Sequence, residues 1–99
     1  MKLLQDILYK VKLLQVEGLT DLVISSIAFD SRKVAKDSLF VALKGTKVDG
    51  HSYIDKAIKL GAKAILAEDL PLQKPDGITF IRVPDSSLAL GVLAANFYD

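Results

Sequence analysis

Polar and glycine residues follow two hydrophobic runs of the sequence, at the positions where each run ends. The run Ile24–Phe29 leads into Asp30-Ser31-Arg32, and the run Leu39–Leu43 leads into Lys44-Gly45-Thr46-Lys47. If the two runs are neighbouring parallel strands, both turns open at the same edge of one sheet, where open α/β sheets bind ligands. Hydroxyls, cations and backbone amides beside a glycine suit an anionic, polar ligand such as a nucleotide diphosphate.

The length of the chain is that of one small domain, and its composition excludes several classes of function. The 99 residues are 51% hydrophobic, with a mean hydropathy of +0.32. Thirteen scattered basic residues against twelve acidic ones give a net charge of +1, so no basic surface for nucleic acid is expected. The absence of cysteine excludes disulfides, thiolate metal sites and cysteine nucleophiles.

The beginning of the chain has neither a signal-peptide core nor a membrane span. Asp6, Lys10 and Lys12 interrupt the apolar residues that follow Met1. Together with the lack of cysteine, which fits a reducing compartment, this pattern predicts a cytoplasmic protein that makes no membrane contact.

Hydrophobic spacing predicts strands and helices that alternate through the second half of the chain. Strands are expected at residues 23–29, 38–43, 62–67 and 78–83. Helical spacing predicts a lid helix over residues 3–11, a helix from residue 53 to Gly61, and a last helix from residue 86. In the second strand, Leu39 and Val41 lie on one face and Phe40 on the other, as in a strand covered on both sides. The expected architecture is a single three-layer α/β/α domain over residues 1–99, with a mostly parallel or mixed sheet.

Residues that commonly cap helices flank the two later helices. Asp49 or Ser52 is expected to cap the helix that begins near residue 53, and Gly61 to end it in a left-handed conformation. Asp85 or Ser86 is expected to cap the last helix.

The last helix is apolar nearly all round, since only Asn96 is strongly polar between Leu88 and Tyr98. Such a helix is either enclosed in a core or faces another domain. A domain of this size cannot enclose its last helix on every side. We therefore expect a further domain to follow Asp99 and to cover this helix.

Five motifs occur in an order and spacing typical of one enzyme family. They are Phe29-Asp-Ser-Arg32, Leu39-Phe-Val-Ala-Leu-Lys-Gly45, Asp49-Gly-His51, Ala57-Ile58 with Gly61-Ala62, and Asp85 with Ala94-Ala-Asn-Phe-Tyr98. Together they resemble the N-terminal domain of Mur ligases, the ATP-dependent amide-bond ligases of peptidoglycan and cell-wall synthesis. The MurE type, a UDP-N-acetylmuramoyl-tripeptide synthetase, is the nearest, and the MurF type is the alternative.

The resemblance implies that this domain holds the UDP end of a UDP-MurNAc-peptide. The residues that it implies as contacts of the uridine diphosphate are Phe29, Ser31, Thr46, Lys47 and Val48. The residues that are expected to support them are Asp30, Arg32, Gly45 and His51. The Ser31 hydroxyl would then donate to a phosphate or uracil oxygen, and Gly45 would let the backbone approach the ligand.

The chemistry of the supporting residues leaves several roles open. Asp30 at a strand end favours a bond to its own turn amides over a catalytic role. The Arg32 guanidinium suits either a neighbouring carboxylate or the diphosphate. His51 is expected to be a neutral hydrogen-bonding residue and not a metal ligand, because no second His or any Cys is available. Glu68 and Asp69 are expected to be solvated carboxylates.

The sequence departs from a complete ligase in one respect. It contains no Gly-x-x-x-x-Gly-Lys-[Ser/Thr] phosphate loop. We therefore expect no catalytic residue, no cofactor and no metal in this chain. The resemblance implies that ATP and Mg²⁺ bind a central domain of the parent enzyme, which would contact this domain through the last helix.

A second hypothesis requires no ligand. In it, the chain is a non-catalytic α/β interaction domain, Asp30–Arg32 is merely a turn, and the last helix docks a partner protein through Leu90, Leu93 or Phe97.

Overall fold

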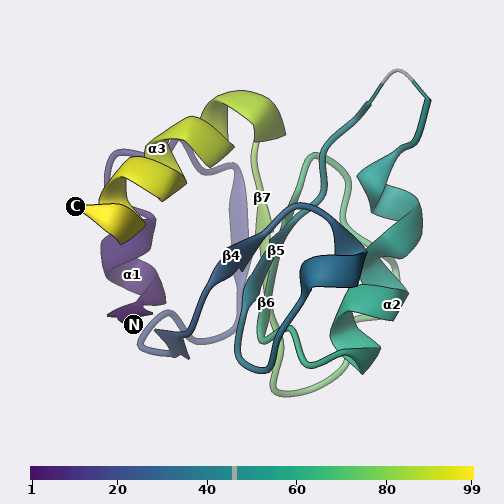
Figure 1. Cartoon of the computed structure of the whole chain (residues 1–99), viewed down its shortest axis with the longest axis horizontal. Helices are drawn as coiled ribbons and strands as arrows, with labels where there is room; N and C mark the ends of the chain where they lie inside the picture. The colour runs from purple at the N-terminus through teal and green to yellow at the C-terminus, as the bar shows by residue number, and fades with distance from the viewer. Residues whose placement is uncertain (46) are drawn as a thin grey trace.

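The apolar runs form a five-stranded mixed sheet in the structure, a computed structural model that describes residues 1–45 and 47–99 (Figure 1). The strand order is β2-β7-β6-β5-β4. Strands β4 to β7 run parallel, and β2 is antiparallel to β7. The strands of this sheet are β2 (Gln15–Glu17), β4 (Ile27–Ala28), β5 (Leu39–Val41), β6 (Ala64–Ala67) and β7 (Thr79–Arg82). A separate antiparallel pair joins β1 (Lys2–Leu3) to β3 (Val23–Ile24).

Helices cover both faces of this sheet. Figure 1 shows α1 (Leu4–Ile7) and α3 (Ser86–Tyr98) on one side and α2 (Ile54–Lys59) on the other. Two short 3-10 helices, η1 (Ser31–Lys33) and η2 (Gly50–Tyr53), lie in the connections. The three-layer α/β/α architecture with a mixed sheet is therefore confirmed. Among the helices of the described residues, none has the length and apolar character needed to cross a bilayer.

Strand β5 is buried on both faces and divides the core into two layers. Leu39 and Val41 belong to the cluster beneath α1 and α3, whereas Phe40 belongs to the cluster beneath α2. Both faces of β6 are buried in the same way. Each large side chain buried in this way contributes about 1.5–3 kcal/mol, so this central pair of strands anchors the sheet.

The predicted strand at 23–29 is interrupted, and this expectation was wrong in detail. Between β3 and β4 the Ser25 hydroxyl donates to the Lys36 carbonyl at 2.6 Å, and the Ser25 amide donates to the Asp37 carbonyl at 2.9 Å. These bonds to the neighbouring turn let the chain leave the small sheet and enter the large one. Because serine competes for backbone groups, it commonly marks such an interruption.

Two further differences concern the beginning of the chain. The lid helix spans only Leu4–Ile7, because Lys10 takes a left-handed conformation with φ 64°. Strand β2 was not predicted, since all three of its residues are exposed and it carries no apolar alternation.

The last helix has a buried and an exposed side. Its N-cap is Asp85, whose side chain accepts from the Leu88 amide at 3.0 Å. Leu93 is fully buried, and Leu90 and Phe97 pack against the core. These three residues therefore hold α3 to the sheet, and the surface that remains carries Leu88 and Tyr98, which are 70% and 71% exposed.

Gly61 ends α2 in the expected left-handed conformation, with φ 113°. The Ala62 amide donates to the Ala57 carbonyl at 3.0 Å across this turn. A Cβ at position 61 would lie 2.9 Å from Lys36 Cα, so both the conformation and the space require glycine.

Gly61→Ala should lower the free energy of unfolding by about 1–3 kcal/mol, because it combines a strained backbone with a backbone clash. Gly91→Ala in α3 is the matched control, since a Cβ there meets no atom within 4 Å. That change should stabilise the protein by up to about 1 kcal/mol through helix propensity. Urea denaturation measures both, and equal effects of the two substitutions would contradict this account.

Candidate functional site

Parallel pairing of β4 with β5 places their two polar turns side by side. The register joins Ile27 to Leu39 and Ala28 to Phe40, so both strands end at the same edge of the sheet. A cavity of about 620 Å³ lies between the turns. The first turn and the second turn both line it, as the sequence predicted for a common edge.

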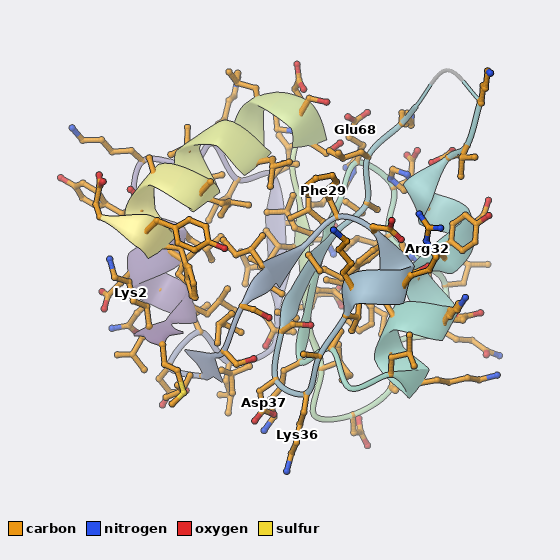
Figure 2. All side chains as sticks on the ribbon, viewed as in Figure 1. Lys2, Phe29, Arg32, Lys36, Asp37 and Glu68 are labelled. Carbon is orange, nitrogen blue, oxygen red and sulfur yellow. The ribbon has the colours of Figure 1, made fainter. Side chains whose placement is uncertain are left out.

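The first turn contributes Phe29, Asp30, Ser31 and Arg32 to the cavity wall. The Phe29 side chain is exposed and follows β4, as Figure 2 shows. Ser31 is only 7% exposed, although it begins η1 at the protein surface. In the described part of the chain its hydroxyl forms no hydrogen bond with another residue, which leaves it available to a ligand.

Asp30 and Arg32 form a closed pair within the first turn. Arg32 Nη2 donates to Asp30 Oδ2 at 2.7 Å, and Arg32 Nε donates to Asp30 Oδ1 at 3.0 Å. The Arg32 backbone amide also donates to Asp30 Oδ1 at 2.9 Å, so Asp30 is the N-cap of η1. Of the two roles left open for Arg32, the structure shows the ion pair with a neighbouring carboxylate.

The same pair lowers the pKa of Asp30 from 3.8 to about 2, mainly through the side-chain hydrogen bond from Arg32 and then through the Arg32 amide. The charged form is therefore favoured in the folded protein. Its contribution to stability is present above pH 3.8 and is lost as the pH falls through about 2.

Arg32→Gln should raise the pKa of the Asp30 carboxyl from about 2 toward 3.8, but not completely, because the backbone amide still donates to it. A carbon-detected NMR titration of Asp30 measures this shift. Lys33→Gln is the control, since Lys33 acts on Asp30 only weakly through charge. If the titration midpoint of Asp30 is the same in Arg32→Gln and the wild type, the ion pair does not form in solution.

The second turn is a hairpin that is closed by contacts of Lys44 and Gly45 with Val48 and Asp49. Lys44 and Asp49 form an isolated antiparallel bridge, and the Gly45 amide donates to the Val48 carbonyl at 3.0 Å. A Cβ on Gly45 would lie 2.6 Å from the Val48 oxygen, so this glycine is needed to close the hairpin itself.

The candidate ligand residues of this hairpin have different positions. Gly45 and Val48 line the cavity. Lys47 is exposed and does not belong to the lining. The prediction for Thr46 falls outside the described residues.

His51 ties the hairpin to the end of β6 and does not line the cavity. Its Nε2 accepts from the backbone amides of Glu68 and Asp69 at 3.1 and 3.2 Å. Nδ1 must then carry the proton, which it donates to Asp49 Oδ1 at 2.7 Å. His51 is thus a hydrogen-bonding residue with a supporting role, and Asp49 caps η2 through the His51 amide at 2.9 Å.

Glu68 extends this network to α3, contrary to the expectation of a solvated carboxylate. Glu68 Oε2 accepts from the Ser86 amide at 2.9 Å and from the Ser86 hydroxyl at 3.0 Å, beside the beginning of α3 (Figure 2). These bonds, the amide first, lower the pKa of Glu68. Lys44 Nζ lies 3.5 Å from Glu68 Oε1 and 3.3 Å from Asp69 Oδ2. Sequence reasoning missed this network because its members come from four separate segments.

Five residues of the cavity lining were not predicted as site residues, namely Phe40, Leu43, Gly50, Tyr53 and Lys56. Of these, Tyr53 ends η2 and Lys56 lies in α2. The helical spacing of three residues that places them on one face was visible in the sequence. What the sequence did not show is that this face borders the strand-end cavity.

Comparison with known proteins identifies the family. The family model described as "Mur ligase family, catalytic domain" matches residues 23–98, most of the chain. The chain belongs to the Mur ligase family.

Two curated relatives of this Mur ligase chain share one name. The chain is 47% identical over 97 residues to a UDP-N-acetylmuramoyl-L-alanyl-D-glutamate–2,6-diaminopimelate ligase from Cytophaga hutchinsonii, which covers 97% of the chain and 20% of that relative. It is 42% identical over 95 residues to the protein of the same name from Bacteroides fragilis, covering 96% and 20%. The chain thus spans about one fifth of the length of these relatives.

Solved structures of MurF proteins share the fold. A crystal structure of MurF from Acinetobacter baumannii superposes with a TM-score of 0.80 and 25% identity, over 95% of this chain and 20% of that one. MurF from Thermotoga maritima in complex with ADP gives a TM-score of 0.63 and 36% identity, over 77% and 17%.

Proposed function

We propose that this chain is the N-terminal domain of a MurE-type ligase and binds the UDP end of a UDP-MurNAc-dipeptide. The observation that carries the proposal is the cavity of about 620 Å³ at the shared carboxyl edge of β4 and β5. A buried serine, a glycine hairpin and apolar side chains surround it, which suits a nucleotide with a flat base and polar phosphates.

The relatives favour the MurE type over the MurF type. Eight curated relatives named as diaminopimelate ligases are 39–47% identical to the chain, whereas the MurF structures are 25–36% identical. We therefore propose that the parent enzyme adds diaminopimelate to the dipeptide, in the cytoplasm.

The contacts with the uridine diphosphate are proposed for Phe29, Ser31 and Val48, which line the cavity, and for Thr46 and Lys47 of the same hairpin. Phe29 and Val48 offer exposed apolar surface for the base. Gly45 closes the hairpin, and His51 holds it to β6.

Mur ligases use ATP and Mg²⁺, but the residues of this chain do not form a site that fits a nucleoside triphosphate and its metal ion. The sequence has no phosphate loop, and no three His, Cys, Asp or Glu side chains within residues 1–45 and 47–99 are grouped to hold a metal ion. We propose that the ATP site lies in a central domain of the parent enzyme and that this chain alone is catalytically inert.

The surface of α3 supports a contact with that central domain. A second cavity of about 390 Å³ lies between β4 and α3, lined by Ile27, Phe29, Leu90 and Tyr98 among others. Tyr98 of this lining is 71% exposed, and Leu88 of the same helix is 70% exposed. Because the relatives are about five times as long as this chain, we propose that the central domain of the same polypeptide covers this surface.

Ser31→Ala should weaken binding of UDP-MurNAc-dipeptide by about 1 kcal/mol, because one hydrogen bond to the ligand is lost. Ser52→Ala is the control, since Ser52 is exposed and lies outside the cavity lining. NMR titration of the labelled chain measures the affinity, and the amides of Ser31, Lys47 and Val48 should shift in the wild type. Shifts centred on other residues, or none at millimolar ligand, would favour the interaction-domain hypothesis.

Leu88→Asp should leave the fold of this chain unchanged, since the side chain is 70% exposed. It should weaken the association of the chain with the remaining domains of the parent ligase, added as a separate polypeptide, because a charge would be buried without a partner. Analytical ultracentrifugation measures the association. Lys59→Asp on the opposite layer is the control, and an equal loss in both variants would argue against docking through α3.

A further inference from the structure

The positive and negative charges of the side chains that line the cavity of about 620 Å³ do not cancel. Asp30, Arg32 and Lys56 are the charged residues of its lining in the described part of the chain. Asp30 and Arg32 neutralise each other, with Arg32 Nη2 2.7 Å from Asp30 Oδ2, and Nε and Nη2 both donate to the carboxylate in a forked arrangement. The Arg32 guanidinium thus already uses, with Asp30, the bidentate geometry in which arginine binds a phosphate.

Lys56 is different, because no carboxylate within the described residues lies within 4 Å of its ammonium. Lys44, at the same edge of the sheet, is held by Glu68 and Asp69. Lys47 lies outside the cavity lining. The cavity therefore carries an uncompensated positive charge on the wall formed by α2.

The remaining walls divide the cavity by polarity. Phe29 after β4 and Val48 in the hairpin supply exposed apolar surface, whereas the Phe40 side chain is buried beneath α2. Tyr53 lies on the same side as Lys56, three residues earlier, and its phenol is a hydrogen-bond donor. A nucleoside diphosphate fits this division with its base on the apolar wall and its phosphates toward α2.

We propose that Lys56 is the cation that binds the diphosphate, with the Tyr53 hydroxyl as a neighbouring donor. This inference rests on the proposed nucleotide-binding function. It assigns recognition of the negatively charged phosphates to a side chain of α2. Arg32 is then a structural residue of the first turn. Lys47, which lies outside the cavity lining, would contact the ligand through its backbone amide and not through its charge.

The test compares UDP with uridine as ligands of the 99-residue chain, because only UDP carries the phosphates. Lys56→Gln should weaken UDP binding about 10-fold, as expected for loss of a charge-assisted hydrogen bond. It should leave uridine binding within about 2-fold and reduce the salt dependence of UDP binding. Lys56→Arg should keep most of the affinity, since the positive charge is retained.

Lys59→Gln is the matched control, because Lys59 is an exposed lysine of the same helix that does not line the cavity. An equal loss of UDP affinity in Lys59→Gln, or an equal loss for uridine in Lys56→Gln, would overturn the assignment. Unchanged UDP affinity in Lys56→Gln would also overturn it while leaving the proposed function intact. If the wild type bound neither compound at millimolar concentration, the proposed function would fail, and this assignment with it.

Discussion

The parallel pairing of β4 with β5 is the constraint on which the rest of the site depends. Only Ile27 with Leu39 and Ala28 with Phe40 are paired between these strands, at the edge of the sheet. So short a pairing is stabilised mainly by its surroundings: β5 is buried on both faces, and β6 holds its other side. Burial of β5 between two helical layers therefore determines where the two polar turns meet.

A second set of interactions fixes the hairpin that follows β5. Such a hairpin, which carries exposed residues, would otherwise have few packing contacts to hold it. His51 connects it to the backbone at the end of β6, and Lys44 connects it to Glu68, which in turn accepts from the beginning of α3. These side chains need not touch a ligand to matter, because they determine where the hairpin amides and Val48 lie relative to Ser31. Preorganisation of this kind lowers the ordering cost of binding.

The sequence predicted those parts of the structure that depend on local pattern. Strands β5, β6 and β7 are short apolar runs, and Gly61 stands where a left-handed residue is required after α2. It did not predict β2, whose exposed residues pair with β7 from the far end of the chain. It also left open whether Arg32 binds Asp30 or a ligand, and it treated Glu68 as a solvated carboxylate. Both roles depend on distances between side chains, and for Glu68 on segments 18 residues apart, which periodicity does not encode.

Phe29 connects the proposed binding and docking surfaces. It lines both the nucleotide cavity and the cavity between β4 and α3, and its side chain is exposed. A domain that covers α3, as proposed, would therefore contact the same aromatic ring that lines the proposed nucleotide site. Burying this ring on one side restricts its rotamers before the ligand arrives, so part of the ordering cost is removed from binding. On this argument this chain alone would bind the proposed nucleotide more weakly than a complete ligase would, with the same proposed contacts to the UDP.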